Sequence, residues 1–276
     1  MKDYSGYIAD IDGVISRGDE VIRPAINAIN SVKAGHKKFV FITNNSTRLP
    51  SEYRERLTKM GIRDVQEADI ITSGTVTANY LKRLLTSEHG KNKAFCVAAD
   101  AVKTLLKNAG FEILGLDGEE YMKADYVVAG EPKLMTHEGR RYLSFDDLNA
   151  AVNAIKHGNA RFIATNPDTT DPMPGGRSKP VAGSIIAYIQ ACTGAKPTIL
   201  GKPRPQMYKD ALEAIGLPAK KVLVIGDRLD TDIKGALDLG IDAALVLTGA
   251  HTRDDVKRLG IKPTYVLNDL SGIKAA

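Results

Sequence analysis

Short apolar runs rich in β-branched and aromatic residues alternate along the chain with longer amphipathic segments. This alternation is typical of βαβ units, in which helices connect the parallel strands of one sheet. Strands are expected at Tyr7–Ile11, Lys38–Thr43, Asp69–Thr72, Ala94–Ala98, Tyr126–Ala129, Arg161–Thr165, Thr198–Leu200, Val222–Ile225 and Ala243–Leu247. The pattern therefore predicts an α/β fold built on parallel strands.

Several of the intervening segments carry recognisable helix ends. One opens with proline, which fits the first turn of a helix because its missing N–H has no intrahelical partner there. Glycine, the usual residue beyond a helix end, follows each of them. These helices are expected at Pro24–Ala34, Ser51–Met60, Asp100–Asn108 and Asp230–Leu239.

Two polar segments, Thr86–Lys93 and Asp168–Lys179, are candidate hinges. If both are hinges, the residues between them form a second α/β module that is inserted into a domain made from the two ends of the chain. Composition alone leaves this organisation open.

The composition is that of a globular protein, with 276 residues, 43% of them hydrophobic and 26% charged. No apolar stretch approaches the ~20 residues that span a bilayer, and the amino terminus lacks a signal-peptide pattern. Both cysteines, Cys96 and Cys192, lie in apolar runs, so we expect buried free thiols. These features predict a cytoplasmic protein with no membrane partner.

The formal net charge of +5 raises the question of nucleic-acid binding. Lys and Arg are dispersed, however, without a basic block and with little aromatic interleaving. A general positive field that attracts small anionic substrates is the better interpretation. We therefore expect no nucleic-acid partner.

Two aspartates, Asp10 and Asp12, stand where the first apolar run stops before Gly13. Side chains alternate along a strand, so the two carboxylates share a direction until the chain turns. Two like charges this close resist joint ionisation unless a cation neutralises them or one carboxyl keeps its proton. The alternative is a pair of solvated turn residues, because Asp-Gly is a common turn dipeptide.

Three further polar segments also follow predicted strands. Thr43-Asn44-Asn45 offers hydroxyl and amide groups, and Lys202 is held between glycine and proline on a restrained backbone. The segment from Asp227 to Asp232 contains three aspartates, oxygen ligands suited to a hard cation such as Mg²⁺. Taken singly, these segments are also explained as a polar turn, a surface lysine and helix N-capping.

Together, the four segments converge because open parallel sheets place ligands at the carboxyl ends of their strands. Carboxylates, hydroxyl and amide donors, a lysine and a metal-binding aspartate match phosphoryl transfer, which depends on positioning and charge neutralisation. The sequence lacks the G-x-G-x-x-G of dinucleotide-binding folds after its first strand, and it has no P-loop.

In order, these segments resemble the four motifs of the haloacid dehalogenase superfamily. Thr43-Asn-Asn-Ser, Thr165-Asn-Pro-Asp168, Gly201-Lys-Pro and Gly226-Asp-Arg-Leu-Asp-Thr-Asp232 resemble its p-nitrophenylphosphatase, or NagD-like, branch. The resemblance implies a Rossmann-like parallel-sheet core with an inserted α/β cap domain. We accordingly expect a core of residues 1–88 and 181–276 and a cap of residues 89–180.

The resemblance also implies site roles. Asp10 would be the nucleophile that forms an aspartyl-phosphate, and Asp12 the general acid and base. Thr43 and Lys202 would hold phosphoryl oxygens. Further substrate-binding residues would be Asn44, Asn45, Asn166 and Asp168. Mg²⁺ would be bound by Asp10, the Asp12 carbonyl and Asp227, while Asp232 acts through a metal-bound water or orients Lys202.

The expected function is a Mg²⁺-dependent phosphatase acting on a small phosphorylated metabolite. Candidate substrates are sugar phosphates, glycerol phosphates, phosphoglycolate and pyridoxal phosphate, with p-nitrophenyl phosphate as an artificial one. A phosphomutase using the same aspartyl-phosphate and a non-catalytic phosphate-binding protein are the alternatives. The sequence leaves the oligomeric state open, with association through the cap as one option.

The chain departs from the branch pattern at two places in the expected cap. The segment Glu131–Ser144 is longer than the usual link to the next helix. Arg177 and Lys179 stand where the branch has a Gly-rich approach to the following helix. Because cap loops select the substrate in this family, these departures leave specificity open, and ordinary loop variation explains them equally well.

Overall fold

The computed structural model describes residues 1–88, 90–132, 143–173 and 177–273. The chain divides into two compact units, each with its own sheet. The first unit comprises Met1–Thr43, Pro50–Ile71 and Lys202–Ala276, and the second comprises Asn44–Leu49 and Thr72–Gly201.

The first unit contains a six-stranded sheet in the order β15-β14-β13-β1-β4-β5. Its strands are β1 (Gly6–Asp10), β4 (Lys38–Thr43), β5 (Ile70–Thr72), β13 (Val222–Gly226), β14 (Asp242–Val246) and β15 (Tyr265–Leu267). β1 pairs in parallel with both β4 and β13. Its helices include α1 (Arg23–Ala34), α2 (Pro50–Lys59), α7 (Pro205–Ile215), α8 (Lys234–Leu237) and α9 (Arg253–Leu259), and β2 (Ser16–Arg17) pairs with β3 (Glu20–Val21).

The core of this unit explains why β1 is apolar on both faces. All five of its residues are buried, as expected for a central parallel strand covered on both sides. Tyr7 lies in register with Phe39 and Leu223, and these side chains share one cluster with Ile29 of α1 and Leu57 of α2. A rigid, fully covered strand thus carries Asp10 at its carboxyl end.

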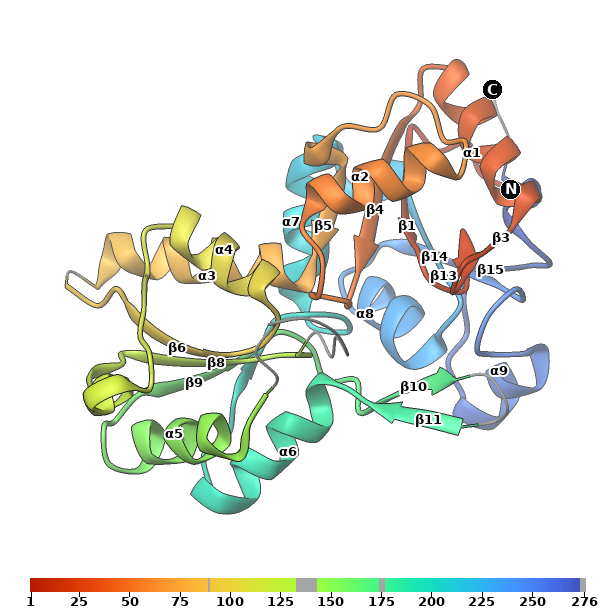
Figure 1. Cartoon of the computed structure of the whole chain (residues 1–276). Helices are drawn as coiled ribbons and strands as arrows, with labels where there is room; N and C mark the ends of the chain where they lie inside the picture. Colours follow the sequence, from red (N-terminus) through yellow and green to blue (C-terminus); the bar gives the residue numbers. More distant parts are fainter. Residues whose placement is uncertain (89, 133–142, 174–176, 274–276) are drawn as a thin grey trace. The chain divides into compact units, whose positions relative to one another are not determined.

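The second unit contains a five-stranded sheet in the order β12-β9-β8-β6-β7. Its strands are β6 (Lys93–Val97), β7 (Glu112–Ile113), β8 (Tyr126–Ala129), β9 (Arg161–Ala164) and β12 (Thr198–Ile199). Helices α3 (Ser73–Ser87) and α4 (Asp100–Asn108) cover one face, and α5 (Phe145–Lys156) and α6 (Ala182–Thr193) cover the other (Figure 1). β10 (Thr170–Met173) and β11 (Arg177–Pro180) form a separate antiparallel hairpin.

The predicted α/β class and parallel sheets are confirmed, and each of the nine predicted strands is present to within one residue at either end. The edge strands β7 and β15 and the hairpin β10–β11 were not predicted, because short, partly exposed strands give little apolar signal. The helix expected at Asp230–Leu239 instead begins with a π-helical turn, Leu229–Ile233, and α8 ends at Leu237.

The compact units have different limits from the expected domains. Residues 44–49, 72–88 and 181–201, which we assigned to the core, lie in the second unit. The physical reason is local pairing, since β12 bonds to β9 and α3 packs against α4. The boundaries at 88/89 and 180/181 stay a prediction, based on polar composition and on the family resemblance.

Cys96 is buried with a free thiol, as predicted, whereas Cys192 is free but exposed, so that expectation was wrong. Cys192 lies in the last turn of α6, where an apolar run no longer ensures burial. Within the described residues, no helix is long and apolar enough to cross a membrane. The cytoplasmic location stays a prediction.

Candidate active site

Three neighbouring strands of the first unit place polar residues at one edge of the sheet. Asp10 ends β1, Thr43 ends β4, and Asp227 directly follows β13. β4, β1 and β13 are adjacent and parallel, so these three residues lie at the carboxyl edge, as the sequence predicted. All three are nearly buried, which is costly for carboxylates that lack partners.

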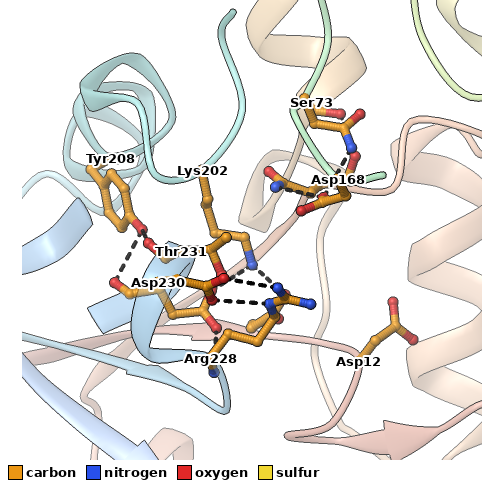
Figure 2. A network of polar contacts seen from close by, with 12 residues as sticks. Asp12, Ser73, Asp168, Lys202, Tyr208, Arg228, Asp230 and Thr231 are labelled. Carbon is orange, nitrogen blue, oxygen red and sulfur yellow. Dashed lines mark hydrogen bonds and ion pairs between the residues drawn. The ribbon is translucent and has the colours of Figure 1, made fainter. Parts of the chain in front are cut away.

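Lys202 supplies the partner for two carboxylates in this unit. Its Nζ lies 2.8 Å from Asp10 Oδ1 and 2.7 Å from Asp232 Oδ1, and the residue is 2% exposed (Figure 2). Burial alone would lower the pKa of Lys202, but the two carboxylates raise it well above its usual range. The lysine is therefore a fixed, permanently charged group beside Asp10.

Asp232 is held by the backbone as well as by the lysine. Its Oδ2 accepts a hydrogen bond from the Arg228 N–H at 3.0 Å. The π-helical turn that carries it is tied to α7, because the Tyr208 hydroxyl lies 2.8 Å from the Thr231 carbonyl oxygen and 3.1 Å from that of Asp232 (Figure 2). Of the two roles expected for Asp232, this geometry matches the orientation of Lys202.

The charges at this edge do not balance. Carboxylate oxygens of Asp10, Asp227 and Asp232 lie within 4.8 Å of one another. Together with the Lys202 ammonium, which pairs with Asp10 and Asp232, the three carboxylates have a formal charge of −2 when fully ionised. Burial raises the pKa of Asp10 well above its usual range, and burial with the nearby Asp232 charge raises that of Asp227 to about 6. The oxygen donors and their charge fit one divalent cation such as Mg²⁺.

Two glycines make room for Asp227. A Cβ at Gly13 or at Gly249 would overlap the Asp227 carboxylate, and Gly13 also has a φ of +81°. The neighbouring Ala250 N–H donates to Asp227 Oδ2 at 2.7 Å. Sequence reasoning treated Gly13 as a turn residue and missed Gly249, whose only signal is its place just after a strand.

Asp12 does not belong to this carboxylate group, and it lies apart from Lys202 (Figure 2). Its side chain is 47% exposed, and its ion pair with Arg56 Nη1 is long, at 3.5 Å. Arg56 also donates to Ser16 Oγ at 2.9 Å. A carboxyl this exposed is accessible to a bound substrate, as a general acid and base must be. Arg56 was not predicted as part of this region.

The second unit brings together three of its four predicted site residues. Asp168 Oδ2 accepts hydrogen bonds from Asn44 Nδ2 at 2.8 Å and from Asn166 Nδ2 at 2.9 Å (Figure 2). Asn45 instead makes a local turn, in which its Oδ1 accepts from the Thr47 N–H and hydroxyl. The expected contact of these four residues with substrate stays a prediction.

The two departures from the branch pattern meet within the second unit. Lys179 Nζ lies 2.5 Å from Glu131 Oε1 and 3.7 Å from Asp171 Oδ2. Burial raises the pKa of Glu131 even though Lys179 opposes that shift. Most of the unusual segment Glu131–Ser144, namely residues 133–142, lies outside the described residues.

A parallel sheet that gathers aspartates, a threonine and a buried lysine at its carboxyl edge defines a phosphoryl-transfer enzyme of the haloacid dehalogenase type. The family model for haloacid dehalogenase-like hydrolases matches residues 7–112, and a second model for HAD-like hydrolases matches residues 199–273. The chain belongs to this family, since relatives at 36% and 33% identity align with it over nearly its whole length.

These relatives have phosphatase activities in their names. Dihydroxyacetone phosphatase from Corynebacterium glutamicum is 36% identical over 97% of this chain and 90% of its own length. Acid sugar phosphatase from Staphylococcus epidermidis is 33% identical over 98% of this chain and 97% of its own. The predicted family and enzyme type, a HAD-type phosphatase, are thereby confirmed.

Solved structures support the predicted branch. The p-nitrophenyl phosphatase from Archaeoglobus fulgidus superposes with a TM-score of 0.85 at 34% identity, covering 98% of each chain. NagD from E. coli K-12 superposes with a TM-score of 0.83 at 28% identity, covering 100% of each. The resemblance to the p-nitrophenylphosphatase and NagD-like branch is therefore confirmed in sequence and in fold.

Proposed function

We propose that this protein is a Mg²⁺-dependent phosphomonoesterase that hydrolyses a small phosphorylated metabolite through an aspartyl-phosphate. The observation that carries the proposal is the buried group around Lys202, in which Asp10 and Asp232 both contact the ammonium and Asp227 completes a cluster of charge −2. Phosphoryl transfer requires this combination of a positioned nucleophile and excess charge that a cation can neutralise.

In this proposal, an Asp10 oxygen attacks phosphorus in line with the leaving oxygen, which takes its proton from Asp12. Asp12 then removes a proton from the water that hydrolyses the aspartyl-phosphate. Thr43 and Lys202 hold the phosphoryl oxygens. Lys202 also favours the ionised form of Asp10, as a nucleophile requires.

Asp10, Asp227 and the Asp12 carbonyl would hold the Mg²⁺ ion. When bound, the ion would neutralise the charge of the carboxylates and of the phosphoryl group. Asp232 keeps its place beside Lys202 rather than serving as a ligand, because its Oδ1 forms an ion pair with the ammonium and its Oδ2 accepts from the Arg228 N–H.

The substrate class is argued from the relatives. One is named for dihydroxyacetone phosphate and another for sugar phosphates. Triose and sugar phosphates are therefore the first substrates to test, followed by glycerol phosphates, phosphoglycolate, pyridoxal phosphate and nucleotides. Phosphate release without a bisphosphate would exclude the phosphomutase alternative, and any turnover would exclude a non-catalytic phosphate-binding protein.

The variant Asp10→Asn tests the proposal because it keeps the side-chain shape and removes the nucleophilic charge. We expect turnover of p-nitrophenyl phosphate with Mg²⁺ to fall by at least about 10³-fold. Asp254→Asn, at an exposed position of α9, is the matched control and should retain wild-type turnover. Substantial Mg²⁺-dependent turnover by Asp10→Asn would contradict the assigned nucleophile.

A further inference from the structure

The chain passes between its two units next to two residues of the proposed site. One passage lies between Thr43 and Asn44, and another between Gly201 and Lys202. Asn44 and Gly201 belong to the second unit, whereas Thr43 and Lys202 belong to the first. Contacts that hold Asn44 and Gly201 in place therefore restrict the positions of Thr43 and Lys202, because a single peptide bond joins the residues of each pair.

Asn44 is held at both its side chain and its backbone. Its Nδ2 donates to Asp168 Oδ2 at 2.8 Å, and its carbonyl oxygen accepts from Ser73 Oγ at 2.5 Å. Gly201 lies against it, since a Cβ on Gly201 would come within 2.6 Å of Asn44 Oδ1. The Gly201 N–H also donates to the Thr165 carbonyl at 2.7 Å, which ties this passage to the end of β9.

Asp168 itself is anchored on regular structure. Its carbonyl oxygen accepts from the Gly183 N–H at 2.6 Å, in the first turn of α6. A Cβ at Gly183 would come within 2.8 Å of that oxygen, so the close approach requires glycine. The carboxylate that receives Asn44 is thus fixed to a helix and to the segment that follows β9.

Asn166 also belongs to this hydrogen-bonded group, and both ends of its side-chain amide form hydrogen bonds. Its Nδ2 donates to Asp168 Oδ2 at 2.9 Å, and its Oδ1 accepts from Thr165 Oγ1 at 2.7 Å. Asn166 is 4% exposed. An amide that is buried and bonded at both ends serves the fold of this segment better than it serves a substrate.

We infer that Asn44, Asn166, Asp168 and Gly201 form an Asp168 clasp that positions Thr43 and Lys202 for phosphoryl transfer. Asp168 is then a positioning residue, in place of the substrate-binding role predicted from the sequence. The inference rests on the proposed roles of Thr43 and Lys202 in holding the phosphoryl group. The clasp should therefore affect phosphoryl transfer equally for all substrates, because it positions the residues that hold the phosphoryl group.

The variant Asp168→Ala tests the clasp because it removes the oxygen that accepts from both Asn44 and Asn166. Asparagine would not serve, since its amide oxygen could take the position of Asp168 Oδ2 and accept the same two hydrogen bonds. We expect kcat to fall about 10- to 100-fold, the cost of a displacement of the order of 1 Å at reacting groups. The factor should be the same for p-nitrophenyl phosphate and dihydroxyacetone phosphate, with KM changed by less than about threefold.

Two further variants sharpen this test. Asn44→Ala should cause a similar loss, and the double variant with Asp168→Ala should be no slower than the slower single variant, since both break one unit. Asp146→Asn, an exposed aspartate of the same unit, is the control and should keep wild-type kcat. All variants should be fully folded at the assay temperature, although those that lose hydrogen bonds within the clasp should melt somewhat below this control.

Several results would overturn the inference. These are an unchanged kcat, a loss that differs between the two substrates or lies in KM, multiplicative losses in the double variant, and losses that disappear once the rate is corrected for the folded fraction. If wild-type enzyme hydrolyses neither substrate, the proposed function fails instead. Binding of orthovanadate with Mg²⁺ then provides the test, because Asp168→Ala should weaken it about 10- to 100-fold and unchanged affinity would exclude the clasp.

Discussion

The unbalanced carboxylates predict that the metal-free protein is destabilised by its own site at neutral pH. Asp227 is 5% exposed, and burial beside Asp232 raises its pKa from 3.8 to about 6. Replacing it by asparagine removes the charge but keeps an acceptor for the Ala250 N–H. In the absence of divalent cations, Asp227→Asn should therefore be more stable than the wild type above pH 6.

The direction follows from proton linkage. The folded state holds the Asp227 proton more tightly than the unfolded chain, so the stability it contributes is complete below pH 3.8. That contribution is lost as the pH rises from 3.8 through about 6, and it stays constant above. A pKa difference of this size corresponds to about 3 kcal/mol, so the variant should gain up to that amount at pH 7.5.

The assay is urea denaturation of both proteins in EDTA, with the free energy of unfolding measured from pH 4.5 to 7.5. The difference between the two proteins should grow with pH and level off near pH 7. Mg²⁺ should reverse the order, since a ligand at 1,000 times its dissociation constant adds about 4.1 kcal/mol to the wild type, more than the advantage of the variant. The variant, which lacks one proposed ligand, should gain much less.

Two outcomes would refute this reasoning. A stability difference in EDTA that does not vary with pH would mean that the Asp227 carboxylate is not destabilising in the folded protein. Equal stabilisation of wild type and variant by Mg²⁺ would mean that Asp227 does not contribute to cation binding. Asp254→Asn controls for the loss of one negative charge, and its difference from the wild type should be small at every pH.

Two other predictions concern the same edge of the sheet. Asp12→Asn should slow hydrolysis of alkyl phosphates more than that of p-nitrophenyl phosphate, whose leaving group needs little protonation; equal losses in kcat would count against the general-acid role. Gly249→Ala, whose Cβ would overlap Asp227, should cost about 1–3 kcal/mol of stability and raise the Mg²⁺ concentration for half-maximal activity about tenfold. Gly115→Ala is the control. The nearest atom to its Cβ would lie at 3.9 Å, so both quantities should stay unchanged.

Strand positions were predictable because buried parallel strands are continuous apolar runs. β1, β4 and β13 are each almost wholly buried, and their limits matched the prediction to within one residue. The edge strand β15, with only partly buried residues, gave no comparable signal. The π-helical turn Leu229–Ile233 was also missed, because its position depends on the bonds from Tyr208 rather than on local periodicity.

The candidate site was predictable where strand ends determine it. Asp10, Thr43 and Asp227 are brought to one edge because adjacent parallel strands end there. Lys202 was predicted to follow a strand, but its local sequence did not predict its partners, since the ion pairs with Asp10 and Asp232 join residues far apart in the chain. The limits of the second unit were equally hidden, because they depend on the pairing of β12 with β9.

The sequence by itself determined the α/β class, the order of the strands along the chain, the family and the chemical groups available at the strand ends. These properties are local, since hydrophobic periodicity and short motifs lie within single segments. Only the tertiary structure decided which carboxylates share Lys202, which glycines make room for Asp227 and which groups surround Asp168. Such contacts depend on burial and on distances between segments, and these exist only once the chain is packed.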